Sequence, residues 1–405
     1  MTIEIGSRRG FVAMLLGGAM GLALTGAAIA QTSGQPVRVG GTLALTGPLA
    51  ATGMVHKIVG EIYVEQLNKK KGLLGRPVEW VLLDDQSKPD LARTLYEKLV
   101  TVDKVDLLIG PYATGAILSA MAVAERQGKL LVHHTFGIPN LAKYDAQFPA
   151  WHMGPVPEKT VAGLLIDALA ASEKPPKTIA IVTSKFPSVH FLAVGARDVA
   201  KAKGLTEVLY LEFEFGTKDF GPIAARVREA NADFLYMGSI GLEGVQLLEA
   251  LKKLNYSPRH HYYTYPAPGP MALSPDAAGA LSTTVFEDQP PFTNNPGAAA
   301  FAKAYKERAE KAGLPYTLAD VQGGASYAAW QILEAAVNAT KSLDDKKLAA
   351  WIHANKVDTI TGKLRFNEMG NYGDDLSKVK QVQNGKWVVV WPKEAAAPGA
   401  KLIAR

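Results

Sequence analysis

Short apolar runs alternate with amphipathic segments along the first third of the chain, which predicts strands separated by helices. Val55, Val59, Ile62 and Tyr63 recur at helical spacing and share one face of an expected helix. The run at residues 78–83 is apolar throughout, as in a strand buried on both faces. Strands are expected over residues 37–45, 78–83, 105–109 and 130–133, with helices over residues 55–67, 91–99 and 116–126. This order predicts a parallel, doubly wound sheet.

The same alternation begins again in the middle of the chain, which indicates a second lobe of similar construction. The expected strands cover residues 178–183, 208–213, 233–237 and 261–265, with helices over residues 193–203, 220–230 and 245–254. The last third adds helices over residues 298–311, 319–341 and 348–354 and strands over residues 362–366 and 387–391. We expect these helices to pack on the first lobe and these strands on the second.

The predicted fold class is α/β, with two doubly wound parallel-sheet lobes joined by a hinge that the chain crosses three times. Proline-rich stretches at residues 155–157 and 289–296 fit two of the crossings. The expected boundaries are residues 37–155 plus 290–358 for lobe 1, residues 156–289 plus 359–392 for lobe 2, and a flexible tail over residues 393–405.

The N-terminal thirty residues have the pattern of a secretory signal. Arg8 and Arg9 precede a short apolar run, and Ala28-Ile29-Ala30 provides small residues for cleavage near Ala30. The paired arginines resemble those of a twin-arginine export signal, although the general export route stays open. An uncleaved membrane anchor is the alternative, but the apolar run is shorter than the ~20 residues that a span needs. We expect an exported protein.

Composition narrows the function further. The 405 residues carry 44 Lys+Arg and 38 Asp+Glu, a formal net charge of +6, and no cysteine. Without Cys the chain has no disulfide, no thiolate nucleophile and no cysteine-based metal site. Removal of residues 1–30 would lower the net charge to +5, which is mild, and no basic stripe with interleaved aromatics indicates nucleic-acid binding.

Sequence motifs for catalysis and metal binding are weak. No G-x-S-x-G elbow occurs, so an enzyme is not predicted, and no cofactor is expected. His133-His134 and His260-His261 lack a third ligand at metal spacing, so no metal is expected either.

Ligands of open parallel sheets bind beyond the carboxyl ends of the strands. Residues 110–115 follow one such end and contain two glycines at phosphate-loop spacing, but Ala116-Ile117 replace the lysine and hydroxyl of that motif. Thr114 and nearby amides at a helix start could instead hold a carboxylate. Simple capping of the helix by Thr114 is the alternative.

Several short motifs, taken in order, resemble one known family. They are residues 42–48 (TLALTGP), 83–86 (LDDQ), 108–111 (LIGP), 179–182 (IAIV) and 361–367 (TGKLRFN). After an export signal, this order resembles the periplasmic branched-chain amino-acid-binding proteins, the type I solute receptors of ABC importers. The resemblance covers about residues 37–390 and implies a receptor that closes two lobes over a small acid, with an inner-membrane permease as its transient partner. A monomer is expected.

By position, the resemblance assigns ligand-binding residues in both lobes. In the first lobe they are Ala113, Thr114, Gly115, Thr135, Phe136 and Gly137, which would hold the ligand carboxylate. In the second lobe Ser188, flanked by Phe186 and His190, stands where the family usually has a tyrosine. We also expect Thr52, Tyr112, Ser239 and Tyr265 among the ligand-binding residues.

One departure from the family pattern bears on the ligand. Amino-acid-binding members carry an acid after the fourth strand of the second lobe, but residues 263–268 (YTYPAP) contain none. A buried ammonium without a partner costs several kcal/mol. We therefore expect a carboxylate ligand without an amine, aromatic or aliphatic, walled by Tyr112, Phe136, Phe186, His190 and Tyr265. Three alternatives stay open. These rings could belong to the hydrophobic core, or Glu243 or Asp288 could approach the ammonium group of an amino-acid ligand. The protein could also be a ligand-sensing receptor of the same fold that signals to a kinase.

Overall fold

A five-stranded parallel sheet forms the centre of the first lobe in the computed structural model, which describes residues 34–135 and 138–404. Val37 pairs with Val78 and Val39 with Leu107, so the first strand lies between the next two. The spatial order is β2 (Val78–Asp84), β1 (Val37–Leu43), β3 (Leu107–Ile109), β4 (Leu131–His133) and β5 (Gln147–Pro149). Every neighbouring pair is parallel, so all five carboxyl ends meet at one edge.

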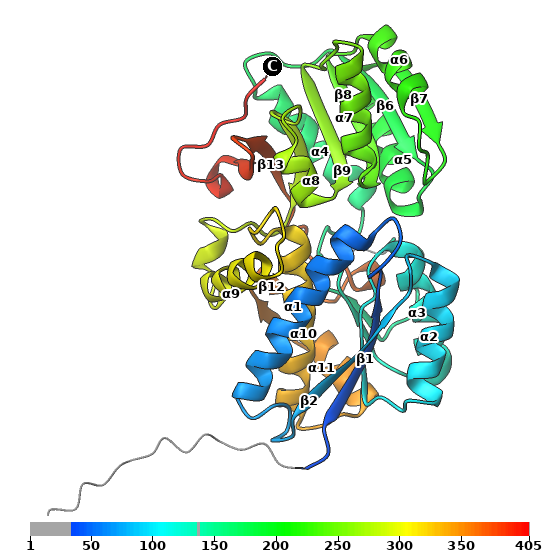
Figure 1. Ribbon diagram of the computed structural model, residues 1–405, viewed down its shortest axis with the longest axis vertical. Coiled ribbons are helices and arrows are strands. Elements are labelled where there is room, and N and C mark those ends of the chain that lie inside the picture. The colour runs from blue at the N-terminus through cyan, green and yellow to red at the C-terminus, as the bar shows by residue number, and fades with distance from the viewer. Residues whose placement is uncertain (1–33, 136–137, 405) are drawn as a thin grey trace, which may run out of the picture. The chain divides into compact units, whose positions relative to one another are not determined.

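Helices cover both faces of this sheet, as strands with apolar side chains on both faces require. Leu108 packs in one hydrophobic cluster, whereas Leu107 and Ile109 on the opposite face pack in another. One face carries α2 (Pro89–Thr101) and α3 (Thr114–Gln127); the other carries α1 (Ala50–Lys69) and α10 (Val321–Thr340), flanked by α9 (Ala298–Lys311) and α11 (Asp345–Ala354). Figure 1 shows α1 and α10, far apart in sequence, side by side.

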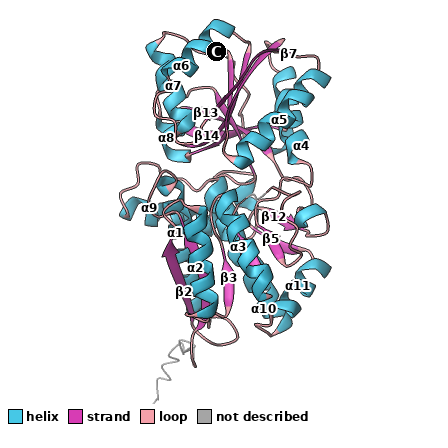
Figure 2. Cartoon of the chain, turned by 90° about the vertical axis from the view of Figure 1, so that its right-hand side faces the viewer, coloured by secondary structure: helices cyan, strands magenta, loops and turns pink. Residues whose placement is uncertain are grey.

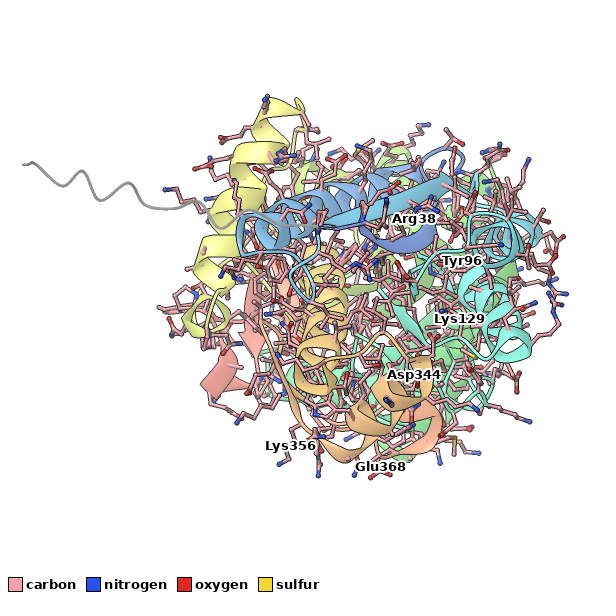
Figure 3. The ribbon with its side chains drawn as sticks, turned by 90° about the horizontal axis from the view of Figure 1, so that it is seen from below. Arg38, Tyr96, Lys129, Asp344, Lys356 and Glu368 are labelled. Carbon is pink, nitrogen blue, oxygen red and sulfur yellow. The ribbon has the colours of Figure 1, made fainter. Side chains whose placement is uncertain are left out.

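The amino-terminal edge of the first sheet is closed by polar contacts (Figure 3). Arg38 of β1 donates its backbone N–H to Asp106 Oδ2 at 2.8 Å. Lys129, which lies just before β4, donates to the Asp106 carbonyl and pairs with Asp345 of α11 at 2.8 Å. Tyr96 of α2 lies at the opposite edge, where it donates its hydroxyl to the carbonyl of Ile109, the last residue of β3, at 2.8 Å. The carboxyl edge is where open parallel sheets bind their ligands.

The second lobe contains a seven-stranded sheet. Its order is β14 (Lys386–Trp391), β13 (Lys378–Gln383), β10 (Ala280–Thr284), β9 (His260–Pro266), β8 (Phe234–Gly241), β6 (Thr178–Ser184) and β7 (Thr206–Phe213). Helices α4 (Pro157–Ala170) and α5 (Pro187–Ala202) cover one face, and α6 (Gly221–Ala230), α7 (Glu243–Lys253) and α8 (Pro268–Leu273) cover the other. The α/β fold class with two lobes is confirmed.

One strand of this sheet, β13, runs against the others. β13 is antiparallel to both β10 and β14, so the sheet is mixed rather than wholly parallel. Asn384 and Gly385 form the turn between β13 and β14 with φ of 51° and 71°. An Asn-Gly pair favours such a hairpin turn because both residues adopt positive φ at little cost.

One sequence expectation about the second lobe is wrong. The sequence assigns the segment from residue 359 to lobe 2, but β12 (Gly362–Leu364) pairs with β11 (Val357–Thr359), which packs beside α10, and β12 lies close to β5 of the first sheet (Figure 2). The physical reason is burial in the first lobe: Leu364 and Phe366 belong to its core, and the Phe366 ring meets that of Phe148 at 5.4 Å.

The chain passes between the two sheets three times: after β5, between β10 and α9, and between the short helix η2 (Met369–Asn371) and β13. Short helices η1 (Phe292–Asn294) and η3 (Lys393–Ala395) complete the element order. A flexible tail was expected from residue 393, but Ile403 exchanges hydrogen bonds with the Gln381 side chain at 2.7 and 2.9 Å, which ties the tail to β13.

The expected export signal, residues 1–30, lies outside the described residues. Within the part that the structure describes, no helix combines the length and hydropathy that a membrane span requires.

Candidate functional site

A small pocket lies at the carboxyl ends of the first-lobe strands and is completed by residues of the second lobe. Its empty volume is about 250 Å³. It is lined by Tyr112, Ala113, Thr114, Thr135, Trp151, Ser188, Ile240, Tyr265 and Gln322. This is the position at which open parallel sheets bind ligands.

Wider hollows lie on the outer surface, but they are less suited to capture a solute. One of about 980 Å³ lies beside Arg197 and Glu207. Those two side chains already form a bidentate ion pair with both N–O distances at 2.7 Å. Their hydrogen-bonding groups are therefore satisfied within the protein.

The first-lobe wall of the pocket is built for hydrogen bonding. Helix α3 begins at Thr114 without a side-chain cap, and Ala113 before it has a φ of 75°. A positive φ is strained for an L-residue, and such strain gathers at functional sites. Thr135 is only 4% exposed, and its Oγ1 has no hydrogen-bond partner. A buried hydroxyl without a partner is costly, and a bound ligand would supply one.

Tyr112 extends this wall with an aromatic ring. The ring is buried and lies 5.0 Å from that of His56 on α1. Burial raises the pKa of Tyr112 to about 12, opposed by a hydrogen bond with Thr52. The phenol is therefore protonated at neutral pH, and Thr52 lies behind the pocket wall as the partner of Tyr112.

Two further aromatic rings, from different lobes, meet across the pocket. Trp151 lies just after β5, and its ring centroid is 5.3 Å from that of Tyr265 on β9, in an edge-to-face arrangement. The Tyr265 hydroxyl donates to the sulfur of Met153 at 3.5 Å. With Tyr112, these rings give the pocket three aromatic surfaces.

The rest of the second-lobe wall is formed by Ser188 and Ile240. Ser188 lies in the first turn of α5, directly after Pro187, and Ile240 lies near the end of β8. Neither side chain is charged. The wall therefore has one small hydroxyl and one aliphatic surface beside the Tyr265 ring.

Glu243 approaches the pocket from α7 but does not line it. Its carboxylate accepts hydrogen bonds at 3.0 Å from the Ser184 hydroxyl and from the Ile240 backbone N–H. Burial raises the pKa of Glu243 to about 7. Both oxygens thus have partners within the lobe, and Asp288, half-buried on the chain before η1, does not line the pocket either.

Gln322 enters the pocket from the first turn of α10, where Asp320 caps the helix. Asp320 Oδ1 accepts from the Gln322 and Gly323 backbone N–H groups at 3.1 and 3.4 Å. Its other oxygen lies 4.0 Å from Lys380 of β13, and Lys380 pairs with Glu287 at 2.7 Å. Burial raises the pKa of both acids, that of Glu287 to about 7. This buried charge cluster connects the helix that presents Gln322 to a strand of the second lobe.

The structure brings together six of the residues expected at the site and leaves others outside. Tyr112, Ala113, Thr114, Thr135, Ser188 and Tyr265 line the pocket. Phe136 and Gly137 lie outside the described residues. Phe186 and His190 do not line this pocket: the Phe186 ring packs on Phe215 at 5.0 Å, and the His190 Nε2 lies 2.7 Å from Glu212.

Helix and strand geometry explain these misplaced residues. Ser188 and His190 are two positions apart on α5, so they point to nearly opposite sides of the helix. Ser239 and Ile240 are neighbours on β8, and Ile240 lines the pocket whereas the buried Ser239 does not. Gly115 lies against Pro89, where an added Cβ would approach the proline ring to 2.8 Å.

Three pocket residues were missed from the sequence: Trp151, Ile240 and Gln322. Strand alternation beside Ser239 could have indicated Ile240. Trp151 follows β5, a three-residue strand too short to give a periodic signal. Gln322 comes from a helix far along the chain, and only the Asp320 cap before it marks the start of that helix.

Comparisons with known proteins agree with this architecture. Residues 36–386 match the model of a family described as periplasmic binding protein. A Leu/Ile/Val-binding protein of Rhizobium johnstonii is 26% identical over 372 residues, which cover 89% of this chain and 95% of that protein. A solved leucine-binding protein of Thermotoga maritima is 21% identical with a TM-score of 0.74, covering 87% of this chain and 97% of that one. A solute-binding protein of an R. palustris ABC transporter, solved in complex with benzoate, is 20% identical with a TM-score of 0.76, covering 91% and 99%.

Proposed function

The chain belongs to the periplasmic binding protein family, and from this premise we propose that it is the solute receptor of an ABC importer for a small carboxylate without an amine. The two lobes close over the ligand, and ligand binding shifts an open–closed equilibrium towards the closed form. Family members are binding proteins, and the pocket is proposed to bind its ligand without chemical change.

The composition of the pocket wall carries the proposal. Among the described residues, none that lines the pocket has a charged side chain. Thr135 offers a hydroxyl without a partner, and α3 begins beside it without a side-chain cap. Hydroxyls and helix amides of this kind hold a carboxylate, and the positive end of the α3 dipole favours its charge.

The same wall disfavours an α-ammonium group. The Glu243 carboxylate accepts hydrogen bonds from Ser184 and Ile240, and because burial raises its pKa to about 7, the group is partly protonated near neutral pH. Burying an ammonium without an anionic partner costs several kcal/mol. The three aromatic rings instead offer apolar surface, and the benzoate complex of a relative supports an aromatic acid as a ligand for this fold.

Amino-acid binding is the second candidate, and two observations favour it. Curated relatives are named Leu/Ile/Val-binding proteins, including one from Escherichia coli K12. Asp320 lies two residues before Gln322, and its Oδ2 has no hydrogen-bond partner. In this alternative Asp320 turns from Lys380 towards a ligand ammonium.

Export and docking complete the proposed function. Residues 1–30 act as a signal that is cleaved near Ala30, and the mature receptor, a monomer, works outside the cytoplasm. The closed form then docks on an inner-membrane permease, as the importer class requires.

A thermal-shift screen of refolded, ligand-stripped mature protein tests the proposal. The panel holds amine-free aliphatic and aromatic carboxylates together with leucine, isoleucine, valine and other amino acids. A ligand at 100 times its dissociation constant adds about 2.7 kcal/mol to stability, which a melting curve resolves. We expect amine-free acids to raise the melting temperature and amino acids to leave it unchanged. A shift with leucine or valine alone would favour the second candidate.

A further inference from the structure

A group of buried polar side chains lies directly behind the first-lobe wall of the pocket. His56 comes from α1, His134 follows β4, and Gln322 and Ser326 come from the first two turns of α10. All four residues are at most 2% exposed. Three separate parts of the first lobe thus contribute polar groups to one place, where apolar packing would be expected.

Ring contacts connect this group to the pocket. The His56 and His134 rings stack at 5.1 Å with an interplanar angle of 16°, and the other neighbour of His56 is the pocket residue Tyr112. Gln322 lines the pocket itself, and its side-chain hydrogen bond with His56 opposes the lowering of the His56 pKa by burial. Ser326 lies one helical turn beyond Gln322 and therefore on the same face of α10. The histidine pair is separated from the pocket by a single layer of side chains.

Much of the hydrogen-bonding capacity in this group is unused. Apart from the interaction between the His56 ring and the Gln322 side chain, no ring nitrogen of His56 or His134 has a partner, and the Ser326 Oγ has none. Native proteins pair almost all buried polar atoms, so a concentration of unpaired ones beside a pocket needs an explanation. A polar group of the ligand is the explanation that also accounts for the position of Gln322 in the wall.

The charge state of the group indicates which kind of ligand atom fits. Burial lowers the pKa of His56 to about 3 and that of His134 well below its usual value, so both imidazoles are neutral. A neutral imidazole has one donor and one acceptor, and an amide oxygen accepts. Asp320, the nearest acid along α10, is engaged with Lys380. An uncharged hydroxyl, which both donates and accepts, matches these groups better than a second charge.

We propose that Gln322, backed by His56 and His134, forms a subsite that recognises a hydroxyl substituent of the acid. The inference rests on the proposed function, because the carboxylate bound near Thr135 and Thr114 fixes the direction in which the substituent points. Gln322 is then the residue that contacts the hydroxyl, and the histidine pair positions the Gln322 amide.

Titration calorimetry with benzoate, 3-hydroxybenzoate and 4-hydroxybenzoate tests the subsite. The wild-type protein is expected to bind one hydroxylated acid at least about tenfold more tightly than benzoate, because an unpaired buried polar group discriminates against the ligand that lacks its partner. The variant Gln322→Met keeps the length of the side chain and should bind all three acids with nearly equal affinity.

A second variant and a control keep the test decisive if Gln322→Met folds poorly. Ser326→Ala should reduce the preference for the hydroxylated acid only in part, whereas Ser239→Ala, at a buried residue that does not line the pocket, should leave it intact. Equal affinities for the three acids in the wild type, or a preference that survives in Gln322→Met, would overturn the subsite while leaving carboxylate binding in place. Binding of leucine with no binding of any acid would overturn the proposed function and the subsite together.

Discussion

The two walls of the pocket differ in what they offer a ligand. The first lobe contributes the start of α3, the unpaired Thr135 hydroxyl and the Gln322 amide. The second lobe contributes Ile240, the Tyr265 ring and the small hydroxyl of Ser188. The difference indicates that the first lobe selects the chemical groups of the ligand, whereas the second covers it and excludes water. Substitutions in the two walls should therefore have unequal effects on affinity.

The largest expected effect comes from cutting the charged connection between the lobes. Lys380→Met leaves Glu287 and Asp320 buried without their cation, which should lower the free energy of unfolding by about 3–5 kcal/mol. Urea unfolding at pH 8 measures this loss. The loss should be smaller at pH 5, because burial raises the pKa of Glu287 to about 7 and this acid takes up a proton below that pH.

Lys386→Met is the matched control for this change. Lys386 is exposed at the start of the neighbouring strand β14, so its replacement should change stability by less than about 0.5 kcal/mol. Equal unfolding midpoints for Lys380→Met and Lys386→Met would contradict the role of the charge cluster.

The second-lobe wall can be probed through pH, because Glu243 holds the Ile240 backbone. The pKa of Glu243 rises from 4.5 to about 7 on folding. Between these values the unfolded chain has lost the proton that the folded chain retains, so stability falls as pH rises from about 4.5 to 7. Glu243→Gln removes this dependence. The difference in the free energy of unfolding between the variant and the wild type should therefore shift in favour of the variant by up to about 3 kcal/mol from pH 4.5 to pH 8.

Chemical unfolding across pH 4–8 checks this prediction, with Glu249→Gln as the control on the exposed side of the same helix. The control should follow the wild-type pH curve. Parallel curves for Glu243→Gln and the wild type would show that the Glu243 carboxyl ionises normally in the folded state.

The first-lobe wall should be the more sensitive one to substitution at the ligand. Thr135→Val keeps the shape of the side chain but removes the hydroxyl, and a hydrogen bond to a charged group contributes about 1.5–3 kcal/mol. Affinity for the bound acid should therefore fall about 10- to 100-fold in titration calorimetry. Ile240→Val in the opposite wall should change affinity less than about threefold, and a Thr135→Val protein with unchanged affinity would rule out this residue as the anion site.

The smallest expected effect lies at Ser188. A hydrogen bond between neutral groups contributes about 0.5–1.5 kcal/mol, so Ser188→Ala should weaken binding about twofold to tenfold. His190→Ala serves as the comparison on the same helix, since His190 faces Glu212 rather than the pocket. A larger loss for His190→Ala than for Ser188→Ala would reverse the orientation assigned to this turn.

Sequence reasoning succeeded where the pattern was local. The alternation of apolar strands and amphipathic helices predicted two α/β lobes, and the strand ends indicated Tyr112, Thr114 and Thr135, which line the pocket at the carboxyl edge. Parallel strands place their carboxyl ends together whatever their spatial order, so this part of the pocket needed no knowledge of the tertiary contacts.

The remaining pocket residues depend on tertiary packing, which no local pattern specifies. Gln322 reaches the pocket because α10 packs against α1, more than 250 positions earlier in the chain. Trp151 depends on the path of the first crossing after the short strand β5. The sequence places β12 in the other lobe for the same reason, since its pairing with β11 and the burial of Leu364 in the first-lobe core decide where that hairpin packs.

The most direct test of the account compares ligands that differ only in the α-amine. Titration calorimetry of ligand-stripped mature protein would use 4-methylpentanoate against leucine and 3-phenylpropanoate against phenylalanine. The wall described above holds a carboxylate but has no charged side chain for an ammonium, so the amine-free member of a bound pair should bind at least about tenfold more tightly. Tighter binding of leucine or phenylalanine than of the matching acid would contradict the account and indicate that an anion such as Asp320 reaches the ligand.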